Sequence, residues 1–317
     1  MPNHHAQNVS AGSAAPIRRR TGAANGLREA INRGLLADYQ VLAVLVSDRD
    51  IHDATGVWPA GPAARSRAVW PTHQSAVHVA VAAAHTSYRL RRIVVIHNSV
   101  AVSRRFTTTF LDIFGPGERR SLTVHHLDEK TSATRRAKIL AELTEPASGF
   151  TTVLSTTRGP LRSLALPAVD AIVPAAPRLL SSELGHFLNL ALRVDASRGQ
   201  PVAIVLPAFL ADDTIELKIQ IKGTRFDHVR TVLRVLARQD PELVDELVEI
   251  GRGERARDGR IRILDGHGAN LDRRLRGEIM GALYASIRRS ITARTPSATT
   301  VNAAAMRRDF PRQGDAS

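Results

Sequence analysis

The residues best suited to chemistry in this sequence are arginines. Lysine and arginine together number 44 against 30 aspartates and glutamates, which gives a formal net charge of +14. Lysine occurs only at Lys130, Lys138, Lys218 and Lys222, so nearly all of this charge is arginine. A basic balance of this size suggests a polyanionic partner such as nucleic acid. The alternative is that arginine and abundant alanine reflect a GC-rich coding sequence.

The sequence lacks the motifs of an autonomous catalytic site. No G-x-x-x-x-G-K-[ST] phosphate loop occurs, and Lys222-Gly223-Thr224 has the wrong order and no upstream glycine pair. Neither a G-x-S-x-G elbow nor an H-E-x-x-H pair is present, and no G-x-G-x-x-G follows an early strand. We therefore expect no catalytic residue, and no nucleotide or other cofactor bound by this chain on its own.

Composition argues against several other classes of protein, namely disulfide-bonded, metal-binding and membrane proteins. The absence of cysteine excludes disulfides and thiolate metal sites and fits a reducing cytosol. The histidines His73, His78 and His85 show no metal-ligand spacing, so we interpret them as structural or exposed and expect no metal. The apolar runs are too short to span a bilayer, and the amino terminus has no signal-peptide core. We expect a cytoplasmic protein that does not bind membranes.

Residues 151–193 are the stretch around which the chain is organised, and they read TTVLSTTRGPLRSLALPAVDAIVPAAPRLLSSELGHFLNLALR. Two short apolar, β-branched runs at residues 151–155 and 169–173 flank a loop, and a segment of helical length follows. Strand, loop, strand and helix in this order are typical of an α/β domain that handles nucleotides.

This stretch resembles the end of the second motor domain of superfamily 2 helicases, in particular bacterial DEAD/DEAH-type helicases with a helicase-associated C-terminal region. The family loop reads N-x-R-x-L-x-E-G-x-D-x-P-A-x-D-A, and the helix after it carries Q-A-x-G-R-A-x-R. The chain agrees with these patterns at Arg158, Pro167, Ala168, Asp170, Ala171, Pro177, Arg178, Ala191, Leu192 and Arg193.

The chain departs from the family at the positions that do chemistry. The substituted positions are Arg162, Ser163 and Ala165 in the loop, and His186, Asn189 and Leu190 in the helix. In the family, the arginine at the position of Leu190 reaches the γ-phosphate as an arginine finger, which contributes a factor of about a thousand or more in rate. Leucine has no donor and no charge. Arg193 remains, either as a residual nucleotide-phosphate contact or as a cation beside a helix carboxyl end.

Other blocks of the chain extend the resemblance over roughly residues 29–250. Residues 91–97 and 100–114 resemble the first strand and helix of that domain, where the strand end at Asn98 would face nucleic acid. Arg135 and Arg136 fall where the family carries an arginine before the next helix, but Asp128 stands where the family has glycine. The resemblance assigns Asn98, Arg158 and Arg178 to nucleic-acid contact.

These observations predict an α/β fold that is RecA-like, with a mainly parallel sheet, helices on both faces and a helical C-terminal extension. We expect disordered tails at residues 1–25 and 296–317, a degenerate second RecA-like domain at 26–210, and the extension at 211–295. Phenylalanines at 106, 110 and 114 predict a core stripe. Residues 260–264 form a possible short strand.

The leading functional hypothesis is a non-catalytic module that binds nucleic acid or assists a helicase. DNA is favoured over RNA as its partner, and a helicase or nuclease chain is a candidate protein partner. The alternative is one subunit of a split ATP-dependent helicase, in which ATP binds only if another chain completes the cleft. A third hypothesis is a decayed copy that folds but has no motor role.

Overall fold

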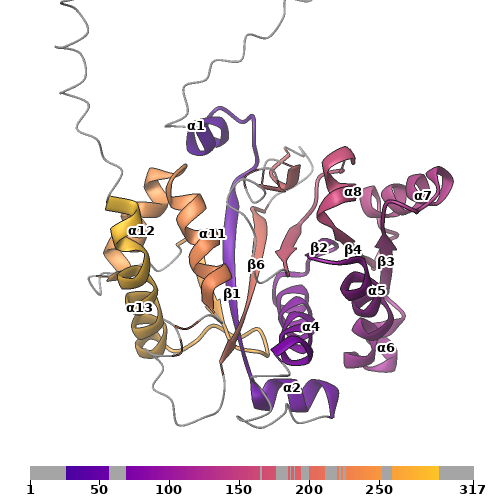
Figure 1. Ribbon diagram of the computed structural model, residues 1–317, viewed down its shortest axis with the longest axis horizontal. Helices are drawn as coiled ribbons and strands as arrows, with labels where there is room; N and C mark the ends of the chain where they lie inside the picture. The colour runs from indigo at the N-terminus through magenta and orange to yellow at the C-terminus, as the bar shows by residue number, and fades with distance from the viewer. Residues whose placement is uncertain are drawn as a thin grey trace, which may run out of the picture.

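The computed structural model describes residues 26–56, 69–164, 166–175, 200–210, 226–251 and 259–292, with residues 185, 187–188, 190–193, 220 and 223 between them. Its centre is a seven-stranded sheet with the order β3-β4-β2-β5-β6-β1-β7 (Figure 1). All pairings between these strands are parallel, which confirms the predicted α/β class. The strands are β1 (Tyr39–Ser47), β2 (Arg92–His97), β3 (Leu122–Leu127), β4 (Thr151–Thr157), β5 (Ala171–Pro174), β6 (Val202–Leu210) and β7 (Ile261–Leu264).

The sheet is buried on both faces, as its nearly continuous apolar strands require. In β1, Val41, Ala43 and Leu45 belong to one hydrophobic cluster, whereas Leu42, Val44 and Val46 belong to the other. The first cluster is completed by side chains of α1 (Gly26–Asn32), α7 (Ala133–Thr144), α8 (Arg158–Ser163), α11 (Asp227–Ala237), α12 (Pro241–Gly251) and α13 (Arg273–Thr292). The second is completed by α2 (Asp48–Thr55), α4 (Val69–Tyr88), α5 (Val100–Thr109) and η1 (Phe110–Ile113). Among the described helices, none has the length and apolar character needed to cross a membrane.

The predicted phenylalanine stripe is a core feature. The ring centroids of Phe106 and Phe110 lie 4.8 Å apart, and those of Phe110 and Phe114 lie 5.1 Å apart. All three side chains are buried. The segment is not one continuous helix, however, because α5 ends at Thr109, a 3₁₀ turn carries Phe110, and Phe114 follows that turn. The short helix α6 (Pro116–Arg119) then leads into β3.

Side-chain oxygens cap the amino ends of several helices. The Ser132 hydroxyl accepts a hydrogen bond from the Arg135 amide at the start of α7, and Asp272 accepts from the Arg274 and Leu275 amides at the start of α13. Pro241 opens α12, where its missing N–H has no consequence. Helix α2 was not predicted, although the Ser47 and Asp50 side chains form a capping box there.

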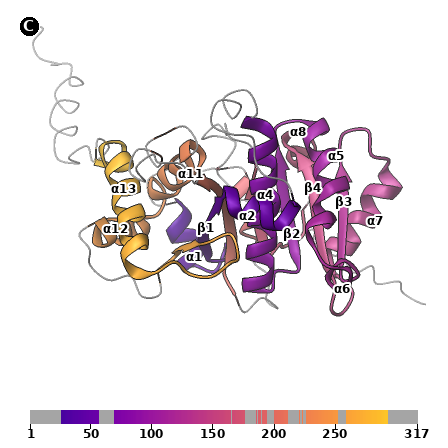
Figure 2. The ribbon, with the colours of Figure 1, turned by 90° about the horizontal axis from the view of Figure 1, so that it is seen from below.

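The carboxyl-terminal region contributes to the same sheet rather than only to a helical layer. Strand β7 pairs with β1, with Val41 opposite Ile261. The Glu246 carboxylate on α12 accepts hydrogen bonds from the Arg260 and Ile261 amides at 2.9 and 3.1 Å. This carboxylate therefore attaches the start of β7 to α12. Figure 2 shows α12 and α13 at one end of the molecule and α7 at the other.

A buried carboxylate joins the amino-terminal helix to this region. Asp240 is completely buried and accepts hydrogen bonds from Arg28 Nη2 and the Tyr39 hydroxyl, both at 2.7 Å. It also caps α12 through the Leu243 amide at 3.3 Å. Burial raises the pKa of Asp240, but the hydrogen bonds from Arg28 and Tyr39 outweigh this and keep the pKa below its usual range. Three elements distant in sequence thus depend on one charged group.

We predict that Asp240→Ala lowers the free energy of unfolding by about 3–5 kcal/mol, because it removes the only fully buried carboxylate among the described partners of Arg28 and leaves that charge with the longer, half-exposed ion pairs to Asp38 and Glu242. Urea denaturation followed by circular dichroism measures the change. Glu249→Ala, at an exposed position on α12, is the matched control and should alter stability by less than about 0.5 kcal/mol. Equal losses in the two variants would contradict the assigned role.

Candidate nucleic-acid interface

The carboxyl ends of the parallel strands form the edge at which ligands bind in open α/β sheets. Asn98 follows β2, Asp128 follows β3 and Arg158 follows β4, so the described structure brings the three loops to one edge. Asn98 is exposed and Arg158 is half-buried. Beside Asn98, the Ser99 hydroxyl accepts a hydrogen bond from the Val102 amide and caps α5. The sheet thus places two of the predicted contact residues near each other.

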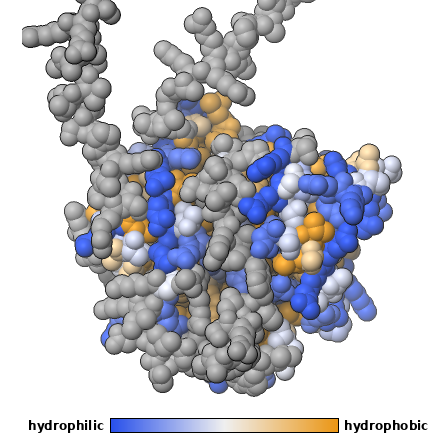
Figure 3. Space-filling model, viewed as in Figure 1, coloured by the Kyte–Doolittle hydropathy of each residue, from blue (hydrophilic) through white to orange (hydrophobic). Residues whose placement is uncertain are grey.

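Basic side chains gather at this edge because α5 and α7 begin there. Arg105, Lys130 and Arg135 are exposed, and the Arg104 side chain is 58% exposed. In Figure 3, hydrophilic residues cover much of the side of the molecule where Figure 1 shows α7 and α8. The helix amino ends add positive potential at the same edge. The arrangement can attract phosphate groups.

The loop after β3 is tied down by a carboxylate that sequence analysis did not single out as functional. Asp128 is 4% exposed. Its Oδ2 accepts from Arg104 Nη2 at 2.7 Å and from His126 Nε2 at 3.2 Å. Its Oδ1 accepts from the Lys130 amide and the Thr131 hydroxyl, both at 3.0 Å. The only hint in the sequence is an aspartate where the family has glycine.

Electrostatics keeps this carboxylate ionised. Burial alone raises the pKa of Asp128, but the hydrogen bonds from Arg104, His126 and Thr131 outweigh burial and bring the pKa well below its usual range. Asp128 therefore carries a full negative charge at any physiological pH.

The contacts of His126 resemble a hydrolase triad only in composition. The Ser103 hydroxyl lies 2.8 Å from His126 Nδ1 and 2.8 Å from the Ser155 hydroxyl. Ser103 and Ser155 are both completely buried, so neither oxygen can reach a substrate. A proton on His126 Nε2, directed at Asp128, leaves Nδ1 to accept from Ser103. The chain of hydrogen bonds anchors β3, β4 and α5 to one another.

The loop after β3 also packs closely against the start of α8. A Cβ atom added at Gly159 would lie 2.3 Å from Glu129 Oε1. Any residue other than glycine at 159 would therefore displace the Glu129 side chain. This contact sets the loop beside the first turn of α8, where Arg158 lies.

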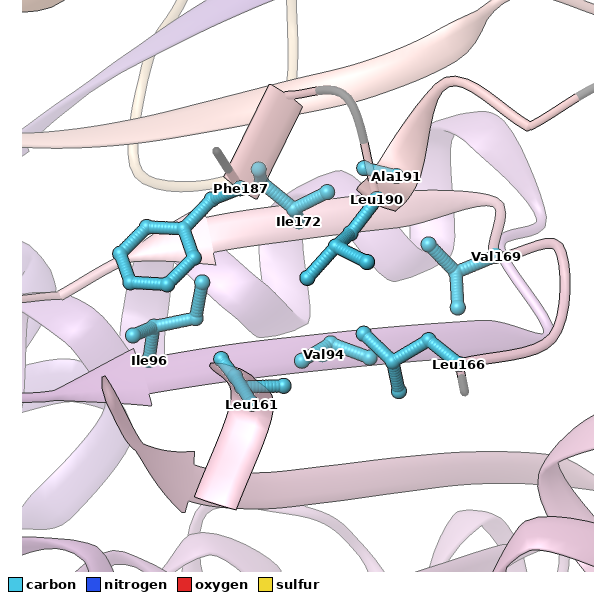
Figure 4. A pocket seen from close by; sticks show the side chains of 9 residues that line it. All are labelled: Val94, Ile96, Leu161, Leu166, Val169, Ile172, Phe187, Leu190 and Ala191. Carbon is cyan, nitrogen blue, oxygen red and sulfur yellow. The ribbon is translucent and has the colours of Figure 1, made fainter. Parts of the chain in front are cut away.

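Of the remaining predicted residues, the structure describes Arg193 and Leu190. Arg193 is exposed and donates from Nη1 to the Leu166 carbonyl at 3.1 Å, so it holds the loop before β5. Leu190 lines an apolar pocket with Ile96, Leu161 and Phe187 (Figure 4). The cavity there is about 10 Å³, too small for a ligand. Arg178, His186 and Asn189 lie outside the described residues.

Four histidines lie buried or half-buried around the ends of β2 and β5. His97 ends β2, is 3% exposed, and its Nε2 has no hydrogen-bond partner among the described residues. His73 Nε2 lies 2.8 Å from the Ala175 carbonyl, and His78 Nε2 lies 3.0 Å from the Thr109 hydroxyl. Burial lowers the pKa of all four, and brings His97 and His228 to about 3. Within the described chain, no group of three or more His, Cys, Asp or Glu residues is arranged to hold a metal ion.

Comparison with known proteins identifies the fold. No family model and no curated protein sequence matches the chain. Among solved structures it is similar to the ATP-dependent Type ISP restriction-modification enzyme LlaBIII bound to DNA, with 15% identity and a TM-score of 0.61. That match covers 83% of this chain and 18% of LlaBIII, so the chain spans less than a fifth of that protein.

Two further structures show weaker similarity. One is a putative HsdR subunit of a type I restriction enzyme from Vibrio vulnificus, with 12% identity and a TM-score of 0.47; the match covers 77% of this chain and 40% of that one. The other is the C-terminal domain of the DEAD-box protein Dbp5, with 10% identity and a TM-score of 0.38; the match covers 67% of this chain and 97% of that one. The similarity to LlaBIII confirms the predicted RecA-like α/β fold and shows the fold alone.

We predict that Leu190→Arg destabilises the protein by roughly 2–4 kcal/mol, because it directs a charge into an apolar pocket. Thermal unfolding measures the loss. Leu35→Arg is the control, since Leu35 is 65% exposed and should tolerate the charge. Normal stability of Leu190→Arg would indicate that the side chain at 190 can face the solvent instead.

We also predict a loss of stability in mild acid. In the unfolded chain a histidine has a pKa of about 6.5, whereas His97 in the fold has a pKa of about 3. The unfolded state therefore binds the proton first, and His97 contributes full stability only above pH 6.5. Below pH 6.5 this contribution falls by up to about 1.4 kcal/mol per pH unit until the pH nears 3.

Urea denaturation from pH 7.5 to pH 4.5 measures this effect, and His97→Leu isolates it. Leucine fills a similar volume and cannot take up the proton, so the variant should lose less stability with falling pH than the wild type. Parallel pH dependences in the two proteins would show that His97 is not the group responsible.

Proposed function

We propose that this chain is a non-catalytic module that binds nucleic acid or assists a helicase. The observation that carries the proposal is the difference between the exposed basic edge of the sheet and the apolar surroundings of Leu190. The carboxyl edge of the sheet presents exposed basic side chains, whereas the position at which the helicase resemblance calls for an arginine finger is Leu190, inside an apolar pocket. The surface suits phosphate binding, and the nucleotide-responsive group is replaced by a packing residue.

The proposed contacts follow the edge. Asn98 and Arg158 lie on the loops after β2 and β4, and Arg135 lies in the first turn of α7. Arg193 is left out of this set, because its neighbours Leu36 and Leu166 precede β1 and β5, at the opposite edge of the sheet. Arg178 is retained from the sequence resemblance and completes the set. These groups would hold the phosphate backbone, which fixes position without reading bases. The proposed partner is DNA rather than RNA, because the LlaBIII structure was determined with DNA.

The split-helicase alternative is not favoured. It requires this chain to complete an ATP cleft in trans with the arginine finger, and Leu190 packs against the sheet core instead. ATP would therefore bind only if a partner chain supplied the phosphate loop. We propose a cytoplasmic location, which the absence of cysteine supports.

The test is binding of labelled single- and double-stranded DNA over a salt series. We expect affinity to fall steeply with salt, because each neutralised phosphate releases counterions. Arg158→Ala and Arg135→Ala should each weaken binding to all sequences alike and reduce the slope of log K against log salt by about 0.7 on single strands and about 0.9 on duplex.

Arg120→Ala is the matched control. Arg120 is exposed at the end of α6, before the amino end of β3, and so lies at the opposite edge of the sheet. Its substitution should leave the slope unchanged. Absence of binding at low salt would mean that the +14 charge is compositional, and the proposal would be rejected.

A further inference from the structure

Asp128 has the hydrogen-bond environment of a bound anion. Four donors from three parts of the fold converge on it: the Arg104 guanidinium from α5, the His126 ring from β3, and the Lys130 amide and Thr131 hydroxyl from the following loop. The distances run from 2.7 to 3.2 Å, within the range for charge-assisted and ordinary hydrogen bonds. Both carboxylate oxygens are used, two donors to each.

The same donors would suit a phosphate group. A guanidinium, a backbone amide, a hydroxyl and an imidazole N–H are the groups that proteins direct at phosphate oxygens. Arg104 is held at one nitrogen by Asp128, yet its side chain is 58% exposed, so the guanidinium reaches both the buried carboxylate and the solvent. The Arg104 guanidinium therefore connects the set of donors with the protein surface.

We propose that Asp128 is a built-in occupant of an anion-binding site, and that its carboxylate weakens the binding of an external phosphate group at this edge. Removing the carboxylate frees the four donors, which then bind inorganic phosphate or a backbone phosphate of DNA. The effect on DNA rests on the proposed function, whereas the anion site itself does not. Asp128 therefore lowers the affinity of this edge for phosphate groups.

The first measurement is thermal unfolding of the wild type and of Asp128→Gly in increasing inorganic phosphate, at constant ionic strength set with sodium chloride. Glycine vacates the carboxylate position. A ligand that binds only the folded state raises the midpoint, and at about tenfold its dissociation constant the shift for a chain of this size is roughly 2–4 °C. We expect phosphate to raise the unfolding midpoint of Asp128→Gly by this amount more than it raises that of the wild type.

Two further variants make the test specific. Arg104→Ala/Asp128→Gly lacks the guanidinium and should lose the phosphate-dependent shift. Asp112→Asn adds the same unit of net charge at a 67% exposed residue and should show no shift beyond the wild type. If Asp128→Gly is too unstable to study, Asp128→Ala also vacates the carboxylate position and should show a shift in the same direction.

The second measurement is DNA affinity of the same variants at fixed salt. We expect Asp128→Gly to bind about three- to tenfold more tightly than Asp112→Asn, with a salt slope steeper by about 0.7 on single strands, as one added phosphate contact requires. A phosphate-dependent shift no larger in both Asp128 variants than in the wild type would overturn the anion site. If phosphate stabilises Asp128→Gly but no protein binds DNA, the anion site stands and the proposed function fails.

Discussion

A parallel sheet with two apolar faces must be covered by helices on both sides, and the rest of this structure depends on that constraint. The register of β1 divides its side chains between the two hydrophobic clusters, and β6 and β7 pair with its two edges. One face is covered by helices from the first half of the chain, whereas part of the other is covered by α11, α12 and α13. The carboxyl-terminal helices are therefore part of the same core, and Asp240 links them to α1 and β1 through buried hydrogen bonds.

The parallel arrangement also explains where charge accumulates. Every strand ends at the same edge and is followed by a loop or helix start, so unpaired backbone N–H groups and loop side chains collect there. Groups of both charges lie at this edge. The arginines and a lysine are exposed to solvent, whereas Asp128 is buried and accepts hydrogen bonds from four donors. The polar residues beneath it, Ser103, Ser155 and His126, fill their hydrogen bonds with one another, which is how a buried polar group is tolerated beside an apolar core.

The pocket around Leu190 shows why a change of one residue type alters what a fold can do. An arginine at this position would need to leave the apolar pocket and reach the solvent, because a charge inside it would be unpaired. Leucine instead packs against Ile96, Leu161 and Phe187, so the helix is held on the sheet by hydrophobic contact. The same helix in an ATP-dependent motor would have to present its polar face to a nucleotide. In this chain its described part serves packing and, through Arg193, the loop before β5.

The class of the fold and the order of most of its elements can be predicted from the amino-acid sequence. The apolar runs of the strands, the phenylalanine stripe and the caps at Ser132, Pro241 and Asp272 are local signals, and the structure follows them. Helix α2 also has a local signal, because Ser47 and Asp50 lie three residues apart and form its capping box. The pairing of β7 with β1 has no such signal, since pairing between strands more than 200 residues apart leaves no local pattern.

The candidate site divides in the same way. The family resemblance pointed to Asn98 and Arg158, and each directly follows a strand, so both lie at one edge of the sheet. The set of donors around Asp128 could not, because Arg104, His126 and Thr131 come from a helix, a strand and a loop that only the folded sheet brings within hydrogen-bond distance. Whether an aspartate is a solvated surface group or a buried, permanently ionised one depends on those neighbours. Its chemistry is therefore a property of the tertiary structure and not of the residue type.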